Sequence, residues 1–480
     1  MNNLFLLTIF IPILNVLAII IKYDASRVKS VFIDILSKIT PLIFFVILLG
    51  FYRHISAQNI EIIEFNSVIT FGFKADRSVI EQLFLLAFLW IIIIFYSERF
   101  LLIDNQNANN FKLFCAIFFA IINLIILSSN LTTTIFCYNF LLLIFIFLLT
   151  NHLFKNITKS SYIFIFLTIF EAILLFLMMV ILVQFNSEIS YNKNGVIINA
   201  SKAQTLFVII LFFAAILLTI LSSAYLLFYK NFNFNSLTNY LSLPLFYGLV
   251  KIFIFTKIIT QIFGIGLFSM IISQEFAHFI EFIFMINILT SLTFMLFGKD
   301  FKTMFLHLFF NQLSFSFLTI FILAFYDEGE ILNVLPAFCL TMTLIFMGFS
   351  NLVLYLKNAK NKEFNGIFYD LKVTISITIF GLLSLIGIVP SLNMMQNFAL
   401  LSLILANKLL FTFMALIINS LGLALFTYKL FFVAFLKNLD NKDESDKMLA
   451  SKIDGSSGMS LGALFLAFII FLLPIIKLIL

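Results

Sequence analysis

The feature that most constrains this chain is a succession of long apolar segments separated by short polar ones. A run of about 18 apolar residues is long enough to cross a bilayer as a helix. Of the 480 residues, 62% are hydrophobic and 11% are charged, whereas soluble domains carry about a quarter of charged residues. The sequence therefore predicts an integral membrane protein. We expect spans at 4–21, 31–51, 78–96, 112–128, 131–154, 162–184, 205–229, 241–272, 278–298, 303–325, 331–356, 373–389, 394–410, 411–436 and 460–480.

One of these spans is expected to be broken. The stretch "GIVPSLNMMQN" lies within 373–410, and Pro390 has no backbone N–H to donate, so this region predicts one discontinuous helix. Counting it once gives about 14 transmembrane helices. A second polar interruption falls at 222–251, and paired broken helices are typical of inverted-repeat transporters. The expected fold is an all-α polytopic membrane protein with two inverted-repeat halves.

The chain is expected to form one transmembrane domain over residues 1–480. It comprises N-terminal helices to about residue 110, a first half at 111–260, a second half at 261–410 and C-terminal helices at 411–480. The first apolar segment follows an uncharged start and lacks a small-residue cleavage site, so we expect a spanning helix rather than a signal peptide. The polar segments are too short for a nucleotide-binding or catalytic domain.

Basic residues concentrate in alternate loops. By the positive-inside rule these loops are cytoplasmic, which predicts both termini on the outer side of the cell inner membrane. The loops concerned contain Lys22, Arg27, Lys29, Arg99, Lys112, Lys155, Lys159, Lys230, Lys299, Lys302, Lys357, Lys360, Lys362, Lys372, Lys437, Lys442, Lys447 and Lys452.

No motif in the sequence points to an enzyme active site. Cys115, Cys137 and Cys339 lie in apolar segments without metal-type spacing, so neither a disulfide nor a metal site is expected. There is no Walker loop, GxGxxG, HExxH or Ser/His/Asp constellation. We expect no cofactor and no nucleic-acid partner.

Ionisable residues inside the expected spans are the functional candidates, because their desolvation must be offset by partners or water. Glu171, Lys251 and Lys408 each fall deep in a span and are candidates for a proton or ion relay. Buried lysines suit such a relay because burial brings proton release within reach of neutral pH. His307 joins them, since Asn311 and the neighbouring Gln312 indicate a hydrated polar track.

Other polar residues favour structural roles. Lys257 lies six residues after Lys251, on roughly the opposite helix face, where snorkelling or contact with another helix would satisfy it. Glu275, His278 and Glu281 share one face near a helix start and predict a solvated interfacial cap. Lys429 and Lys477 lie near span ends, where snorkelling suffices.

Several stretches resemble, in order, the proton-channel subunits of respiratory complex I and of Mrp-type cation/proton antiporters. The resemblance to the family's third helix and its lead-in rests on "FGFKADRSVIEQLFLLAFLWIIIIFYSERF", and the resemblance to its fifth helix rests on "SNLTTTIFCYNFLLLIFIFLL". The stretch "LSLPLFYGLVKIFIFTKI" resembles its eighth helix, and "DFKTMFLHLFFNQLSFS" and "GIVPSLNMMQNF" resemble two later motifs. The resemblance implies an antiporter-like subunit that works with other membrane subunits to move protons or monovalent cations.

The same resemblance implies that much of the family's ion relay is substituted. The fifth-helix glutamate position falls on Asn139, the seventh-helix lysine near Ser222 and the twelfth-helix charge on Asn397. In "TMTLIFMGFS" a family lysine position falls on Met342, and Phe338 takes a histidine position. Only the eighth-helix lysine is kept, as Lys251. Asp300, Lys302 and Gln312 match a motif but resemble loop and packing residues.

Three functions follow from these expectations. The first is a membrane subunit of a complex-I-type NADH:quinone oxidoreductase that contributes to proton translocation, itself non-catalytic. The alternative is a D-like subunit of an Mrp-type antiporter, or a scaffold subunit that has lost its own transport. The third is a polysaccharide or lipid flippase, which has similar length and helix number but lacks the "FGFxxD" lead-in and the late G-I-x-P break.

Overall fold

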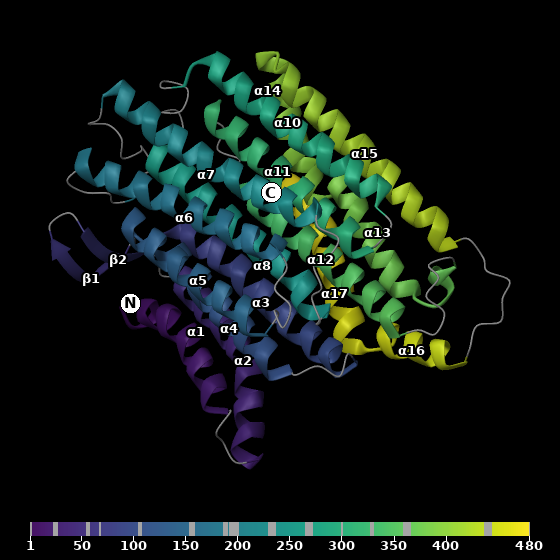
Figure 1. The fold of residues 1–480 in the computed structure, drawn as a ribbon. Coiled ribbons are helices and arrows are strands. Elements are labelled where there is room, and N and C mark those ends of the chain that lie inside the picture. The colour runs from purple at the N-terminus through teal and green to yellow at the C-terminus, as the bar shows by residue number, and fades with distance from the viewer. Residues whose placement is uncertain are drawn as a thin grey trace. The chain divides into compact units, whose positions relative to one another are not determined.

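The computed structural model describes residues 2–22, 27–53, 58–66, 69–103, 108–152, 159–185, 191, 201–228, 237–264, 272–298, 301–326, 331–358, 366–435 and 444–479. Within these ranges the chain is almost entirely helical (Figure 1). The helices of the first part of the chain are α1 (Asn2–Lys22), α2 (Arg27–Tyr52), α3 (Arg77–Ile103), α4 (Ala108–Leu127), α5 (Leu131–His152), α6 (Lys159–Phe185), α7 (Lys202–Phe228) and α8 (Leu237–Ile258). Those of the second part are α10 (Gln274–Phe297), α11 (Phe301–Phe325), α12 (Ile331–Asn358), α13 (Lys372–Ile386), α14 (Leu392–Asn407), α15 (Leu410–Phe435), α16 (Glu444–Asp454) and α17 (Ser457–Ile479). A π-helical turn at Ile259–Gly264 extends α8, and a short 3-10 turn lies at Ile367–Tyr369.

The predicted all-α polytopic membrane fold is confirmed. Among the described residues, 11 helices are long and apolar enough to cross a membrane, and each falls on a predicted span. Three shorter apolar helices, at 112–127, 131–144 and 372–386, fall on predicted spans as well. The agreement follows from a local rule, because in hydrocarbon every backbone polar group must be satisfied within the helix.

A β-hairpin and the short helix α16 are elements that the sequence did not predict. Strands β1 (Gln58–Asn66) and β2 (Ile69–Ala75) pair antiparallel, with irregular register after Glu61 and after Glu64. β-branched and aromatic residues in "NIEIIEF" and "ITFGF" favour extended structure. An isolated bridge joins Phe73 of β2 to Ser128, the residue that follows α4.

The predicted break near Pro390 is present. Helix α13 ends at Gly387, which has a φ of 90° and so adopts the left-handed region that glycine tolerates best. Ser391 then begins α14, and its hydroxyl accepts a hydrogen bond from the backbone N–H of Met394. A second break separates α14 from α15 at Lys408, which also has a positive φ of 54°.

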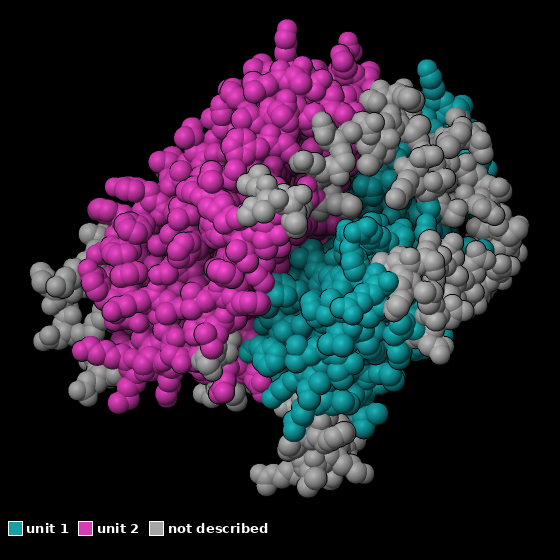
Figure 2. Space-filling view, turned by 180° about the vertical axis from the view of Figure 1, so that it is seen from behind, with its two compact units in different colours: residues 1–95, 107–222, 253–267 teal, residues 96–106, 223–252, 268–480 magenta. Residues whose placement is uncertain are grey.

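The chain divides into two compact units, which are coloured separately in Figure 2. Unit 1 comprises residues 1–95, 107–222 and 253–267, and unit 2 comprises residues 96–106, 223–252 and 268–480. The units are interleaved in sequence, with α8 contributing to both. The predicted division into sequential halves therefore stays a prediction.

Each unit has its own packed core. In unit 1, α4 packs on α1 and α5, α5 packs on α6, and the Trp90 ring lies between Phe44 and Phe119. In unit 2, α10, α11 and α15 pack together, and α12 packs against α13 and α17. Helices α11 and α12 are buried throughout their apolar windows, which explains why they are apolar on all sides.

Candidate functional site

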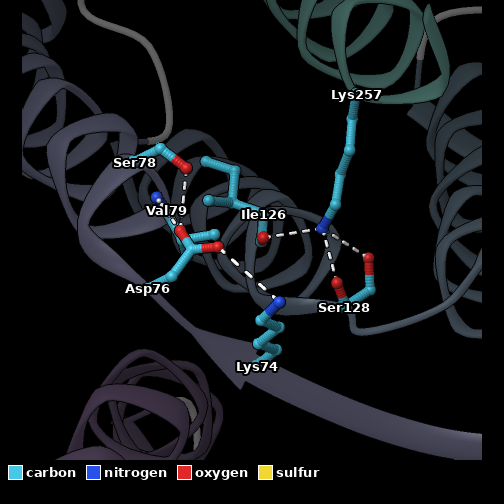
Figure 3. A network of polar contacts seen from close by, with 7 residues as sticks. All are labelled: Lys74, Asp76, Ser78, Val79, Ile126, Ser128 and Lys257. Carbon is cyan, nitrogen blue, oxygen red and sulfur yellow. Dashed lines mark hydrogen bonds and ion pairs between the residues drawn. The ribbon is translucent and has the colours of Figure 1, made fainter. Parts of the chain in front are cut away.

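Lys257, at the last turn of α8, is a buried charged residue of unit 1. Its ammonium donates to the carbonyl oxygens of Ile126 (2.7 Å) and Ser128 (2.7 Å) and to the Ser128 hydroxyl (2.8 Å) (Figure 3). It also donates to the carbonyl oxygen of Ile125 (2.9 Å). The ends of helices leave carbonyls without partners, and a cation there is favoured by the helix dipole. Lys257 thus closes the C-terminus of α4. It is 4% exposed, so the predicted contact with another helix is present and snorkelling is not.

The N-terminus of a helix, α3, lies close to this C-terminus of α4 (Figure 3). The Asp76 carboxylate accepts from the Ser78 hydroxyl (2.7 Å) and from the backbone N–H of Val79 (2.9 Å), which caps the N-terminus of α3. Lys74 lies 3.9 Å from the same carboxylate (Figure 3). The "FGFKAD" segment therefore places an acidic cap on α3 at the end of β2.

A buried carboxylate joins α5 and α6 in the interior of unit 1. Glu171 is fully buried, and its Oε1 accepts a hydrogen bond from the Tyr138 hydroxyl at 3.2 Å. Tyr138 is buried too, whereas the neighbouring Asn139 is half-buried. The amide that marks the family's glutamate position is thus not the most buried polar residue of α5. The carboxylate beside that position comes from α6.

Lys251 is a buried charge of unit 2 and lies within α8, about two turns before its end. It is 1% exposed, and its ammonium lies 4.8 Å from the centre of the Tyr247 ring one turn earlier on α8. A cation over an aromatic face is stabilised by the ring quadrupole. Lys251 is therefore buried, as predicted. Like Glu171, it contacts a tyrosine side chain.

The predicted solvated cap at Glu275, His278 and Glu281 is wrong for Glu281. Glu275 is exposed, but Glu281 is 1% exposed and accepts hydrogen bonds from the Thr412 hydroxyl (2.8 Å) and backbone N–H (3.3 Å). Thr412 lies in the first turn of α15, so Glu281 caps that helix from α10. His278 lies 3.3 Å from the same carboxylate. Helical spacing gave the shared face correctly, but not the helix that packs on it.

Two other lysines are also found at helix ends. Lys408 was expected deep in a span, and this is wrong: it is exposed, at the left-handed end of α14. Lys429 donates to the carbonyl of Leu296 at 2.7 Å, at the C-terminus of α10, instead of snorkelling. The relay role assigned to Lys408 stays a prediction that its exposed position does not favour.

The expected polar track does not include His307, because the nearby amides bond to other residues. Asn311 and Gln312 donate to the Asn419 side-chain oxygen of α15, at 2.6 and 3.2 Å, and Ser291 of α10 donates to Asn311. These contacts form a neutral network that ties three helices together. His307 instead stacks on Phe294, with its Nδ1 buried and without a hydrogen-bond partner among the described residues.

The family's twelfth-helix charge position also performs a capping role. Asn397 donates to the carbonyl of Ile386 at 3.4 Å, across the break between α13 and α14. One turn earlier, Asn393 donates to Thr341 (2.9 Å) and Ser384 (3.1 Å). Amides thus stabilise the broken helix where the family carries a charge.

The remaining substituted positions show no polar contact or have side chains outside the described residues. Met342 and Phe338 are buried apolar side chains of α12, and Phe338 packs on Phe309. Ser222 lies in α7, but its side chain is outside the described residues, as are Asp300 and the Lys302 side chain. No group of three potential metal ligands occurs in the part of the chain that is described.

The sequence interpretation missed a chain of hydrogen bonds in unit 2. Tyr96 donates to Asn351 (2.8 Å), Asn351 to Thr374 (3.2 Å), and Thr374 to Asp454 (2.6 Å) at the end of α16. Asp454 also accepts from the backbone N–H of Val373 at 2.8 Å, and so caps α13. The sequence did not indicate that Asp454 caps a helix, because the start of that helix lies about 80 residues earlier in the chain.

No family model matches this sequence, and neither does any curated protein. Among solved structures, the chain matches one in the structure of the Mrp complex from Dietzia sp. DQ12-45-1b, with a TM-score of 0.74 and 12% identity. The match covers 100% of this chain and 96% of that one. This chain therefore shares the fold of that chain of the Mrp complex. At so low an identity the likeness establishes the fold and leaves its function to be argued from its own residues.

Proposed function

We propose that this chain is a membrane subunit of a multi-subunit assembly that moves protons or monovalent cations, and that Glu171 and Lys251 are its charge-carrying residues. The proposal rests on one observation. Most of the buried or partly buried charges described above sit at helix ends, whereas Glu171 and Lys251 lie within helices and each contacts a tyrosine. An ionisable group inside a membrane helix, away from a helix end, has a functional role by default.

The fold supports the assembly part of the proposal. The solved neighbour is a chain of a complex named as Mrp, and the match extends over nearly the whole of both chains. A complex-I-type assembly, which the sequence also suggested, uses subunits that resemble the same family. Other membrane subunits are therefore the expected partners in either case.

A second candidate is a scaffold subunit without transport of its own. It is favoured by the capping role of Asn397 and by the apolar packing of Met342 and Phe338, since neutral side chains at these positions cannot change charge. The two candidates predict opposite outcomes for the same substitutions.

The experiment is ion transport by the complete assembly in membrane vesicles, with Glu171→Gln and Lys251→Met in this chain. The proposal expects each substitution to reduce ion-coupled proton movement at least about tenfold, the effect of about 1.4 kcal/mol on a barrier. The exposed Glu275→Gln and Lys447→Met are matched controls and should leave transport unchanged. Unchanged transport in both test variants, at normal assembly, would favour the scaffold.

Co-purification decides which assembly the chain belongs to. A tagged chain should recover stoichiometric membrane subunits: quinone-reductase subunits for a complex-I-type assembly, or small Mrp-type subunits for an antiporter. Recovery of the chain without other membrane subunits would reject the assembly.

A further inference from the structure

The environment of Lys257 has the composition of a monovalent cation site. Three carbonyl oxygens and one hydroxyl oxygen lie 2.7–2.9 Å from the ammonium nitrogen. Carbonyl oxygens in such a cluster replace the hydration shell of K⁺ in proteins. The distances exceed the roughly 2.3–2.6 Å that Ca²⁺ takes, and they suit ions of the size of ammonium and K⁺.

The oxygens around Lys257 outnumber the N–H donors of its ammonium. A lysine ammonium has three N–H donors, and four oxygens surround it, so at least one donor is shared. The Tyr191 ring covers another side of the ammonium, with its centre 4.8 Å from the nitrogen. The ammonium is therefore held by four oxygens and one aromatic face.

The walls of this shell are fixed by contacts that do not involve Lys257. The Ser128 hydroxyl bonds to the Ile125 carbonyl (2.7 Å) and pairs with the Thr134 hydroxyl (2.6 Å), which in turn contacts the Tyr191 hydroxyl. The Tyr191 backbone N–H donates to the Ser129 carbonyl at 2.9 Å.

The segment after α4 is also secured from the hairpin. Ser129 donates its N–H to the Gly72 carbonyl at 2.9 Å, and Asn130 donates to the Thr70 carbonyl at 2.6 Å. The Asn130 oxygen accepts from the backbone N–H of Thr133 (2.9 Å) and so caps α5. The oxygen positions therefore belong to the scaffold of unit 1 rather than to the lysine.

We propose that the end of α4 forms an oxygen cage of K⁺ size that this chain keeps filled with its own Lys257 ammonium, and that emptying the cage creates a binding site for K⁺ or ammonium. The inference does not depend on the proposed transport function. It concerns α4, α5 and the hairpin of unit 1, and neither Glu171 nor Lys251 takes part.

The test uses Lys257→Ala, which empties the cage, and Lys257→Met, which removes the charge but keeps a side chain in the space. Thermal unfolding of the purified full chain is measured in detergent with KCl, NH₄Cl, NaCl or N-methyl-D-glucamine chloride at one ionic strength. Lys257→Ala should unfold earlier than the native chain in N-methyl-D-glucamine. Its midpoint should rise with the logarithm of the K⁺ or ammonium concentration, by about 2 °C or more once that concentration is several times the dissociation constant, because a ligand that binds only the folded state stabilises it.

The controls separate a cage from a general salt effect. The native chain and Lys257→Met should show no difference between K⁺ and N-methyl-D-glucamine, and the double variant Lys257→Ala/Ser128→Ala should lose most of the rescue. If Lys257→Ala is too unstable to purify, its yield of monodisperse protein from membranes extracted in K⁺ or in N-methyl-D-glucamine gives the same comparison. Equal midpoints or equal yields in the two salts would overturn the proposal. Equal rescue by Na⁺ and K⁺ would overturn the size match.

Discussion

The hydroxyl of Tyr138 on α5 donates a hydrogen bond to Oε1 of Glu171 on α6 across 3.2 Å. Tyr138 directly precedes Asn139, on which the sequence resemblance places the fifth-helix glutamate position of the family. Here α6 supplies the carboxylate and α5 the phenol. Asn139, the residue that matches the family position, is only half-buried. The polar interruption of α5 is thus accounted for mainly by Tyr138.

This division of roles predicts unequal costs for two adjacent substitutions. Tyr138→Ala leaves a cavity and removes a hydrogen-bond donor to a buried carboxylate, so it should lower the free energy of unfolding by about 3–5 kcal/mol. Asn139→Ala should change it by less than about 1 kcal/mol, because a half-buried amide loses little. A thiol-reactive dye can follow unfolding, since Cys115, Cys137 and Cys339 are all buried free thiols. Equal destabilisation by the two variants would contradict the assignment.

A second prediction concerns lysines at helix ends. The Lys429 ammonium satisfies the carbonyl of Leu296 at the end of α10. Lys429→Met should lower the free energy of unfolding by about 1.5–3 kcal/mol, the usual contribution of a hydrogen bond to a charged group. The exposed Lys447→Met is the matched control, with no expected loss in the same dye assay. If both variants unfold at the native temperature, Lys429 merely snorkels.

The spans and their breaks could be predicted because their causes are local. Apolar length sets a membrane helix, and Pro390 with Gly387 stops one wherever it lies. The second break, at Lys408, lies close to the predicted boundary between the spans 394–410 and 411–436, which follows because 394–436 is too long for one membrane helix. The hairpin was missed because its two strands lie between much stronger helical signals.

The charged sites could be found only in part. Burial of Glu171 and Lys251 follows from depth within an apolar run, which the sequence displays. The partners of Lys257 and Glu281 do not follow from it, since a helix end more than 100 residues away supplies the contacts of each. Sequence spacing describes one helix face, whereas a cap requires knowing which helix begins or ends beside it.

Close packing between α12 and α13 gives a third prediction. A Cβ added at Gly348 would overlap the Thr378 hydroxyl of α13, whereas one added at Gly462 on α17 would meet nothing within 4 Å. Small residues let membrane helices approach closely, so Gly348→Ala should separate α12 from α13 and lower the unfolding temperature. Gly462→Ala should leave it unchanged or raise it slightly, because alanine favours the helix. Tolerance of Gly348→Ala would show that the two helices separate at little cost.

The last prediction concerns Asp454, which caps α13 from the end of α16. Burial raises the pKa of this carboxyl above its ordinary 3.8, although hydrogen bonds from Thr374 and from the backbone N–H of Val373 act in the lowering direction. A carboxyl whose pKa is higher in the folded than in the unfolded chain binds its proton more tightly when folded. Its contribution to the free energy of unfolding is therefore fully present below pH 3.8 and is lost as the pH rises through the folded-state pKa.

The unfolding temperature of the native chain should accordingly fall as the pH rises from about 4 towards neutrality, through the contribution of Asp454. Asp454→Asn carries no titrating carboxyl, so its unfolding temperature should fall less over the same pH range, whatever its absolute value. The exposed Glu275→Gln serves as the control for loss of a carboxylate and should follow the native pH profile. Parallel profiles for Asp454→Asn and the native chain would mean that the hydrogen bonds at the start of α13 cancel the effect of desolvation on the pKa of Asp454.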